Sequence, residues 1–247
     1  MSKRRLGDKI SIDGAYQYNA FYTGHPVQRF WHYAKYSQAR KLLSVVPGDI
    51  VLDVGCGSGV LSYFIAKDNP SSKVIGIDCN ASAIAFCRAK YSLPNLKFKK
   101  CLADEINYKD GSISKIVFLE VIEHIYENQA KLVMKRFHRL LKKGGRVVIS
   151  TPNYHSSWPV VEFLLDKLKL VPHLSGQQHV VKYTPYKLMT LGYRTGFKTI
   201  SKHSVNFIAA WLNTFSNSLA KKMHALEARN PYNFGNVLVY AFEKNIT

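Results

Sequence analysis

The sequence predicts an α/β fold of the Rossmann-like, doubly wound type, built on a mostly parallel sheet. Two observations carry this prediction. Between residues 50 and 150, short apolar runs alternate with longer segments of helical spacing. The first apolar run leads directly into a glycine-rich turn, "VLDVGCGSG", where such folds hold a ligand. Because this alternation needs crossover helices, neighbouring strands should run parallel.

The apolar spacing places the elements in chain order. Residues 1–24 show no clear period and are expected to form an N-terminal arm, followed by a single domain over residues 25–247. Helical spacing runs from 25 to 46 and stops before Pro47 and Gly48. The predicted strands are 50–54, 73–77, 96–100, 116–119 and 146–150. The predicted helices between them are 59–67, 81–91 and 129–142, with Gly144 and Gly145 capping the last.

The composition favours a reduced, cytoplasmic protein. With 247 residues, 47% of them hydrophobic, the chain can bury one large core. The four cysteines, at 56, 79, 87 and 101, include no Cys-x-x-Cys pair, which favours structural thiols. The basic start "MSKRRLGDKISID" lacks the apolar core of a secretory signal. No apolar run reaches the roughly 18 residues that a membrane span needs.

The net charge is +19, from 35 basic and 16 acidic residues. Such a surface attracts anions, either nucleic-acid phosphates or acidic lipid headgroups. Because the basic residues are spread along the chain, the charge by itself does not distinguish a specific anionic partner from a generally basic surface. The residues that follow the predicted strands have the opposite character, since several of them are acidic.

The glycine turn suits a cationic ligand better than a phosphate. Only Gly55 and Gly57 fit the dinucleotide fingerprint, and Asp53 would repel a pyrophosphate. S-adenosylmethionine carries a sulfonium and an ammonium group and no phosphate, so Asp53 would favour it. Asp78 follows the second strand at the spacing of an acid that binds a ribose diol. Asp104 follows the third strand and could accept a hydrogen bond from an adenine amino group.

A second acidic group follows the fourth strand, in "FLEVIEHI". A helical turn there would bring Glu120, Glu123 and His124 to one face, and His179 precedes a later helix in "GQQHVVKYTPYKL". These four side chains could bind a divalent metal such as Mg²⁺, which would lower the pKa of a substrate hydroxyl. Alternatively, an imidazole could act as general base. In the simplest interpretation, the first acid only contacts the cofactor and His124 caps a helix.

The region from about 49 to 150 resembles the class I S-adenosylmethionine-dependent methyltransferases. That resemblance implies a seven-stranded sheet whose last strand is antiparallel, with "GFKTISKHSV" and "NVLVYAFEK" as strands six and seven. It also implies a cofactor site at the ends of the first four strands. Its expected residues are Asp53, Gly55, Gly57, Asp78, Cys79, Asp104 and Leu119.

Three further motifs, "EVIEH", "STPNYHSSWPVVEFLLDKLKLVP" and "GQQHVVKYTPYKL", are similar to the ubiquinone-biosynthesis O-methyltransferases over roughly residues 25–195. The small-RNA 3′-terminal 2′-O-methyltransferases share the E-x-x-E-H…H arrangement more distantly and use it for a divalent metal. Carried over, this resemblance implies metal ligation by Glu120, Glu123, His124 and His179, with Glu120, His124 and His179 also as catalytic candidates. The segment 207–229 has no obvious counterpart in the ubiquinone enzymes, which leaves the acceptor open.

Two apolar helical insertions are expected, at about 156–172 and 206–229. The spacing of the first groups Trp158, Val161, Leu164, Leu165 and Leu168 on one face, with Glu162, Asp166, Lys167 and Lys169 largely on the other. The spacing of the second groups Ile208, Trp211, Leu212, Phe215, Leu219 and Met223 in one stripe. Taken alone, each helix is expected to be a lid whose apolar face packs on the domain. Together with the excess of basic residues, they suggest a surface that rests on anionic lipid.

The sequence therefore predicts an S-adenosylmethionine-dependent methyltransferase that acts on an oxygen of a lipophilic or phenolic small molecule. It is expected in the cytoplasm, in peripheral contact with a membrane, without an obligate protein partner. RNA 2′-O-methylation is the alternative, because aromatic residues in "AYQYNAFYTGHPVQRFWHYAKY" could stack on bases, although no RNA-binding module is present. An inactive methyltransferase-like scaffold is a third reading, which the intact acidic set opposes.

Overall fold

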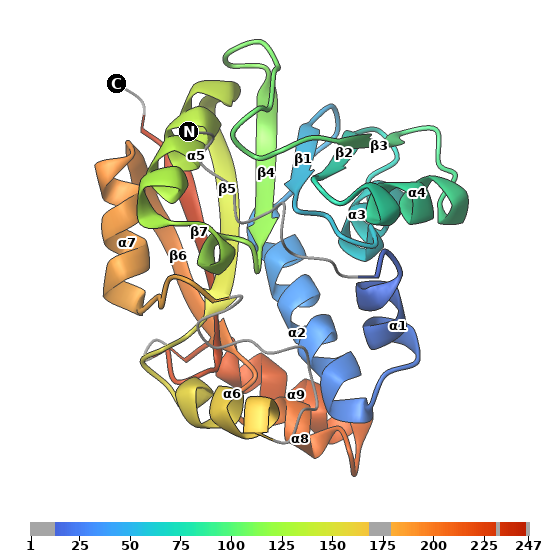
Figure 1. Ribbon diagram of the computed structural model, residues 1–247, viewed down its shortest axis with the longest axis vertical. Coiled ribbons are helices and arrows are strands. Elements are labelled where there is room, and N and C mark those ends of the chain that lie inside the picture. Colours follow the sequence, from blue (N-terminus) through green and yellow to red (C-terminus); the bar gives the residue numbers. More distant parts are fainter. Residues whose placement is uncertain (1–12, 168–178, 231–232, 246–247) are drawn as a thin grey trace.

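The computed structural model describes residues 13–167, 179–230 and 233–245. These residues form a seven-stranded sheet of order β3-β2-β1-β4-β5-β7-β6 with helices on both faces (Figure 1). The strands from β1 to β5 run parallel, and β7 is antiparallel to both β5 and β6. The predicted doubly wound sheet of seven strands with an antiparallel last strand is confirmed.

The strands agree closely with the apolar runs of the sequence. Their bounds are β1 (Ile50–Val54), β2 (Lys73–Asp78), β3 (Leu96–Lys100), β4 (Ile113–Leu119), β5 (Leu141–Pro152), β6 (Phe197–Val205) and β7 (Val237–Lys244). Successive side chains of a strand enter two different cores, one on each side of the sheet. Val51 and Val117 pack on one side, whereas Leu52 and Ile116 pack on the other.

Helices cover both faces of the sheet, as a parallel sheet requires. One face carries α2 (Pro26–Leu43), α3 (Val60–Asp68), α4 (Ala81–Lys90), α8 (Ala209–Leu212) and α9 (Asn217–Glu227). The other face carries α5 (Glu127–Leu140) and α7 (Pro185–Arg194). Two further helices lie at the carboxyl end of the parallel strands (Figure 1), the 3₁₀ turn η2 (Ile122–His124) and α6 (Trp158–Lys167). No helix among the described residues is both long enough and apolar enough to cross a bilayer.

Local side chains fix where several helices begin. Asn80 caps α4 by accepting hydrogen bonds from the N–H groups of Ser82 and Ala83. Proline stands in the first turn of both α2 and α7, where its missing N–H is not needed. These signals position the strand-to-helix turns that form the site.

One predicted helix end is wrong. Helix α5 ends at Leu140, and β5 begins at the next residue, so Gly144 and Gly145 belong to the strand. Gly144 has φ +66°, and the pairing of β5 with β4 shifts register across the two glycines. The glycines thus form an irregularity in the strand rather than a helix cap.

Part of the N-terminal arm is helical, although its sequence shows no clear periodicity of apolar residues. Residues Tyr16–Tyr22 form helix α1, which packs on α2 (Figure 1). The predicted long helix at 206–229 is in fact two helices, α8 and α9, because polar groups interrupt it. Asn213 donates to the carbonyl of Pro26, and Ser216 caps α9.

The apolar faces predicted for the two insertions are correct only in part: Trp158 is buried, and Leu212 and Met223 pack against the core. In α6, Glu162 is buried while Leu164 is 48% exposed; Leu168 and Lys169 lie outside the described residues. In α8 and α9, the buried side chains are Ala209, Ala210, Ala220 and His224. Trp211 and Phe215 are 48% and 88% exposed. Both insertions therefore present apolar side chains to the outside.

Candidate functional site

The glycine turn joins β1 to α3 beside the point where the strand order reverses, between β1 and β4. Gly55, Gly57 and Gly59 all have positive φ, at +73°, +50° and +72°. Side chains are strained in this conformation. In addition, a Cβ on Gly55 would collide with Val121, and one on Gly57 would collide with Gln17 of α1. Only glycine fits these positions, and Gln17 of α1 covers the turn by accepting the N–H group of Ser58.

Asp78, at the end of β2, closes the glycine turn. Its carboxylate accepts the N–H groups of Gly57 and Asn80, each at 2.8 Å. Cys79 follows it, half-buried, and Asp104 lies exposed in the turn after β3. Leu119 ends β4 and is buried. The predicted cofactor residues are therefore all found at the carboxyl ends of the four adjacent strands β1 to β4.

Asp53 is buried directly beneath this turn. It is 3% exposed and accepts a hydrogen bond of 2.6 Å from the Ser62 hydroxyl. Burial, reinforced by the charge of Asp78 and opposed by the Ser62 bond, raises the pKa of Asp53 to about 7. A buried carboxyl group of this kind is stabilised in its charged form by a nearby cation. The site thus fits a nucleoside cofactor that carries positive charge, as the sequence predicts.

A second polar group lies after β4, in the 3₁₀ turn η2. Glu123 is 1% exposed, and its Oε2 atom has no hydrogen-bond partner among the described residues. Burial, and secondly the charge of Glu120, hold the pKa of Glu123 well above its usual value. A buried oxygen without a partner is rare and calls for a ligand or a functional role.

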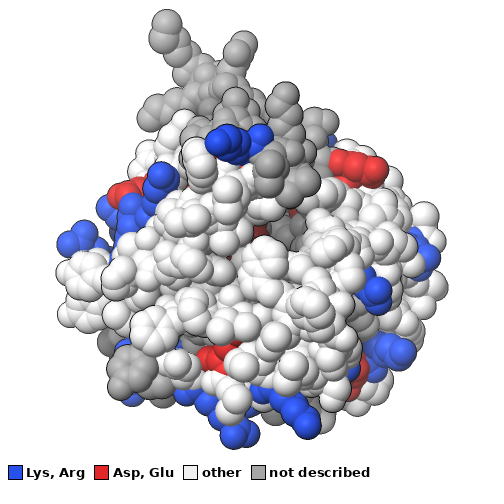
Figure 2. Space-filling model, turned by 90° about the horizontal axis from the view of Figure 1, so that it is seen from below, with Lys and Arg blue, Asp and Glu red and all other residues white. Residues whose placement is uncertain are grey.

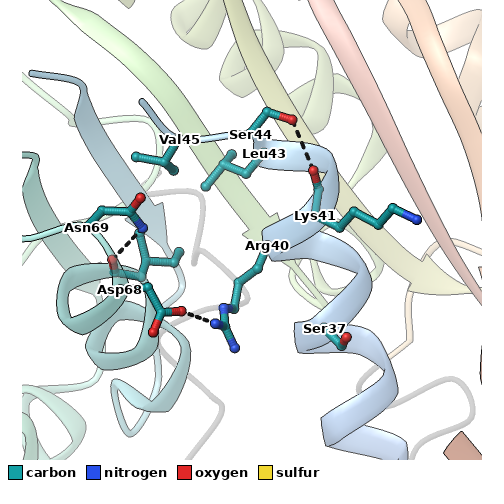
Figure 3. Close-up of a pocket in the computed structure, with 9 residues that line it drawn as sticks. Ser37, Arg40, Lys41, Leu43, Ser44, Val45, Asp68 and Asn69 are labelled. Carbon is teal, nitrogen blue, oxygen red and sulfur yellow. Dashed lines mark hydrogen bonds and ion pairs between the residues drawn. The ribbon is translucent and has the colours of Figure 1, made fainter. Parts of the chain in front are cut away.

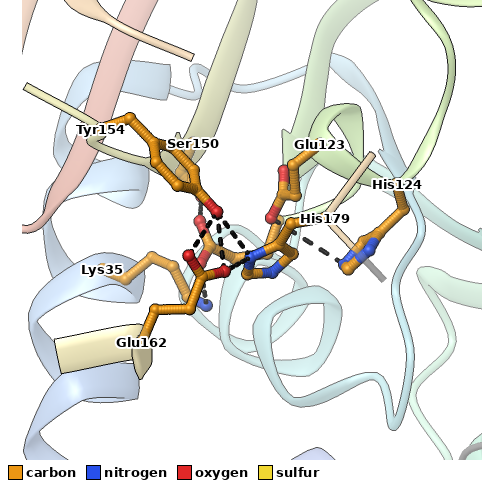
Figure 4. A network of polar contacts seen from close by, with 8 residues as sticks. Lys35, Glu123, His124, Ser150, Tyr154, Glu162 and His179 are labelled. Carbon is orange, nitrogen blue, oxygen red and sulfur yellow. Dashed lines mark hydrogen bonds and ion pairs between the residues drawn. The ribbon is translucent and has the colours of Figure 1, made fainter. Parts of the chain in front are cut away.

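Glu123, His124 and His179 form one group. A potential ligand atom of each lies within 4.8 Å of the others (Figure 4). The carbonyl of Glu123 accepts the N–H groups of Val180 and Val181 at 2.9 and 3.2 Å, which holds His179 beside it. One carboxylate and two imidazoles are the donor types that divalent transition metals and Zn²⁺ prefer. The residues present therefore fit a metal ion.

Glu120, the fourth predicted ligand, lies outside this group. Its backbone has φ +53°, and its carboxylate accepts a 2.6 Å hydrogen bond from the Ser150 hydroxyl. The Nζ atom of Lys35 lies 3.8 Å from its other oxygen. Lys35 comes from α2 and is 5% exposed. The structure thus brings three of the four predicted residues together and pairs the fourth with a buried lysine.

The sequence assigns no role in the site to three polar residues that the structure places here, namely Lys35, Tyr154 and Glu162. Figure 4 shows the carboxylate of Glu162, from α6, against the ring of His179 and the hydroxyl of Tyr154. Glu162 was assigned to the exposed side of its helix by its spacing. The available signal was its context, a single acid within the run "WPVVEFLL".

A separate cavity of about 400 Å³ lies between the C-terminal ends of α2 and α3 (Figure 3). Its lining includes Arg40 and Asp68, which form an ion pair with each other. Because α2 and α3 lead into β1 and β2, this cavity is at the amino edge of the sheet. It is therefore remote from the glycine turn and from the Glu123 group.

Comparisons with known proteins agree with this geometry. Residues 46–201 match the family model described as a methyltransferase domain. The chain is 30% identical over 152 residues to a demethylmenaquinone methyltransferase of Chlorobaculum parvum, covering 61% of each. It is 34% identical over 109 residues to a ubiquinone biosynthesis O-methyltransferase of Pseudomonas paraeruginosa, covering 43% of this chain and 45% of that protein. The chain spans 47% to 61% of the length of the first curated relatives.

Solved structures share the fold. An S-adenosylmethionine-dependent methyltransferase from Mesorhizobium loti superposes with a TM-score of 0.63 at 18% identity, over 85% of this chain and 98% of that one. A geranyl diphosphate methyltransferase superposes with a TM-score of 0.62 at 16% identity, over 87% and 78%. The family match covers more than half of the chain, and the glycine turn, the acids at the strand ends and the sheet order all accord with it. The chain belongs to the methyltransferase-domain family of S-adenosylmethionine-dependent methyltransferases.

Proposed function

We propose that the protein methylates an oxygen of a lipophilic or phenolic small molecule, using S-adenosylmethionine. One observation carries the proposal: a buried group of metal-binding and proton-accepting side chains lies beside the cofactor turn, under a rim of exposed apolar residues. A hydroxyl acceptor needs help to lose its proton, and such a group supplies that help.

The cofactor would be held by the residues at the strand ends. Asp53 provides a negative charge under the glycine turn, and Asp78 is placed to bind a ribose diol. Bound there, the cofactor supplies a methyl group on a cationic sulfur. The chain's own contribution is to hold the acceptor oxygen in line with that methyl group and to exclude water, which lowers the entropic part of the barrier.

Glu123, His124 and His179 would hold a divalent metal ion, and the two imidazoles favour a transition-metal ion over the Mg²⁺ expected from the sequence. That ion would lower the pKa of an acceptor hydroxyl. Ser150 and Lys35 hold the carboxylate of Glu120 in a fixed place on the side of α2. From there Glu120 would help to position the acceptor. If no metal binds, an imidazole of the same group would accept the proton directly.

The entrance supports a lipophilic acceptor. Figure 2 shows the molecule from the side of α6 and α8, with mostly uncharged atoms around a hollow in which acidic atoms are visible. Large exposed apolar side chains contribute to this side, which we call the apolar rim: Val160, Phe163, Leu164, Phe207, Ile208, Trp211 and Phe215. Two relatives are named for quinones. An apolar rim on a protein of charge +19 suits the surface of an anionic membrane.

RNA is the second candidate acceptor, and the surface favours it less. The aromatic side chains proposed to stack on bases are engaged within the protein. Phe30 is buried, and Phe21 packs against Tyr36 and Phe64. Lys and Arg are also sparse around the hollow in Figure 2, whereas a nucleic-acid site needs them close to the phosphates. The third alternative, an inactive methyltransferase-like scaffold, is disfavoured because the glycine turn expected to bind the cofactor is intact.

The direct test is transfer of a labelled methyl group. The protein is incubated with labelled S-adenosylmethionine, Mg²⁺ and, separately, lipid extract, small catechols and phenols, and short RNA. We expect label in the lipid or phenol samples and loss of transfer with Asp78→Ala. Label in RNA alone would replace the proposal by its alternative, and cofactor binding without transfer to any sample would favour the scaffold.

A further inference from the structure

Helix α6 turns its central acid inward. Glu162 is 3% exposed, whereas its neighbours Val160 and Phe163 are 63% and 62% exposed. Removing a carboxylate from water is strongly unfavourable unless short hydrogen bonds to the charged oxygens offset the lost hydration. Helix α6 therefore buries Glu162 together with Trp158 while other apolar side chains stay exposed, and contacts of Glu162 must compensate for the burial of its charge.

Those contacts are short and reach two residues of the site. Oε1 of Glu162 lies 2.6 Å from Nδ1 of His179. The hydroxyl of Tyr154 donates to the same carboxylate, at 2.7 Å from Oε1 and 2.8 Å from Oε2. Burial raises the pKa of the Tyr154 hydroxyl, so it stays protonated and remains a donor. Figure 4 shows this three-residue contact on one side of the His179 ring, with Glu123 and His124 beside it.

The hydrogen bonds select one form of the imidazole. Nδ1 of His179 faces two oxygens, Oε1 of Glu162 at 2.6 Å and the Tyr154 hydroxyl at 3.1 Å. A carboxylate only accepts, so a proton on Nδ1 satisfies this contact. In a neutral imidazole, the other nitrogen, Nε2, then carries the lone pair. The N–H groups of Val180 and Val181 bind the carbonyl of Glu123, which keeps the backbone at His179 next to the group.

We propose that Glu162 is a positioning residue that fixes His179 with its proton on Nδ1, so that Nε2 offers a lone pair to a metal ion or to an acceptor proton. Tyr154 supports the same carboxylate from a second direction. This inference rests on the proposed function of His179. It deepens that function by making α6 part of the chemical site as well as of the apolar rim, which explains why the helix buries its acid.

The test uses Glu162→Gln, which keeps the size of the side chain but can either accept or donate. The matched control is Asp166→Asn, which removes the same charge from the same helix. Histidines are labelled with ¹⁵N, His179 is assigned by the loss of its signals in His179→Gln, and two-bond ¹H–¹⁵N spectra report which ring nitrogen is protonated. Adenosylhomocysteine affinity measures the integrity of the fold, and Mn²⁺ affinity measures the metal group.

We expect His179 to be protonated on Nδ1 in the natural protein and in Asp166→Asn. In Glu162→Gln it should shift toward the Nε2-protonated form and lose about 10- to 100-fold in Mn²⁺ affinity, with adenosylhomocysteine binding unchanged. A natural protein with the proton on Nε2, or a variant with the natural tautomer, would overturn the proposal. The spectra report the protonated nitrogen of His179 even if no acceptor is methylated. A failure of the proposed function, which appears in the methyl-transfer assay, is therefore distinguishable from a failure of this inference.

Discussion

Lys35, on α2, directs its ammonium group to the carboxylate of Glu120 at the end of β4, with 3.8 Å between Nζ and Oε2. Both side chains lie beside Glu123, whose Oε1 atom is 3.9 Å from Nε2 of His124 and whose carboxyl group also feels the positive charge of Lys35. The buried lysine therefore compensates for the negative charge that two neighbouring glutamates bring into one end of the sheet.

We expect Lys35→Met to destabilise the protein by about 2 kcal/mol, because it leaves Glu120 partly buried without its cation. Removing the acid as well, in Lys35→Met/Glu120→Gln, should recover most of that loss. Urea unfolding measures both. Lys41→Met is the matched control, since it removes an exposed lysine from the same helix. Additive losses in the double variant would show that the two charges do not interact.

The raised pKa of Asp53 predicts a pH-dependent cofactor affinity. A cationic cofactor favours the carboxylate, which dominates only above a pH of about 7 in the free protein. Affinity for S-adenosylmethionine should therefore fall as the pH drops below about 7, by up to about tenfold per pH unit. Calorimetry near neutral pH should also detect proton release on binding, as a dependence of the heat on the buffer.

Two variants check the assignment to Asp53. Asp53→Asn should bind weakly at all pH values and lose the dependence. Ser62→Ala should move the dependence to higher pH, because the lost hydrogen bond stabilised the carboxylate. In the cofactor-free protein, the native state holds this proton at a pH where the unfolded chain has released it. Its stability should thus decline as the pH rises from about 4 to about 7. A flat affinity profile in the natural protein would contradict the prediction.

The group of Glu123, His124 and His179 makes a prediction for metal binding that differs from the four-ligand set implied by the sequence motif. Glu123→Gln and His124→Ala should each weaken Mn²⁺ binding by at least about tenfold, since each removes a donor. Glu120→Gln should have a smaller effect, because Glu120 is bound to Ser150 and Lys35 instead. Glu127→Gln serves as the control, an exposed acid of α5 that pairs with Lys187. If Glu120→Gln and Glu123→Gln weaken Mn²⁺ binding equally, Glu120 is a metal ligand after all and the four-ligand set implied by the sequence is correct.

A chelator distinguishes metal assistance from general-base catalysis by the same residues. If the metal is required, methyl transfer should stop on chelation and return with Mg²⁺ or Mn²⁺. Transfer that continues in chelator, together with no detectable Mn²⁺ binding, would assign proton removal to an imidazole of the group.

The fold was predictable because its signals are local. The strands at 50–54 and 96–100 match the prediction residue for residue. The first is apolar and buried almost throughout, whereas the second alternates buried Leu96 and Phe98 with exposed lysines, the pattern of a half-buried strand at the edge of the sheet. The acids at strand ends were also predictable, because parallel strands share one carboxyl edge. These arguments need only the sequence of each segment and its place in the sheet.

The missed features depend on tertiary contacts. Spacing assigns Glu162 to the exposed face of α6, and only the position of His179, brought there by backbone bonds to Glu123, reverses that assignment. Likewise, nothing in the helical pattern of 25–46 indicates that Lys35 points to Glu120. Helix α8 ends where Asn213 binds the carbonyl of Pro26, a contact between segments far apart in the chain.

The apolar rim predicts membrane binding through two of its most prominent side chains. Trp211 and Phe215 are 48% and 88% exposed, and each would gain about 1 to 2 kcal/mol by entering a bilayer interface. Trp211→Gln/Phe215→Gln should therefore reduce flotation with vesicles of anionic phospholipid by at least about tenfold. Methyl transfer to an acceptor embedded in those vesicles should fall in parallel, while transfer to a short, water-soluble analogue stays unchanged.

The control is Val46→Gln/Tyr193→Gln, which removes two equally apolar and exposed side chains, 54% and 80%, from the other end of the sheet. Val46 precedes β1 and Tyr193 precedes β6, so both lie away from the rim. If the protein binds vesicles through general charge attraction only, both double variants will float like the natural protein, and salt will release all three. If the rim is the contact, only the Trp211 and Phe215 pair will lose flotation, and moderate salt will weaken but not abolish binding by the natural protein.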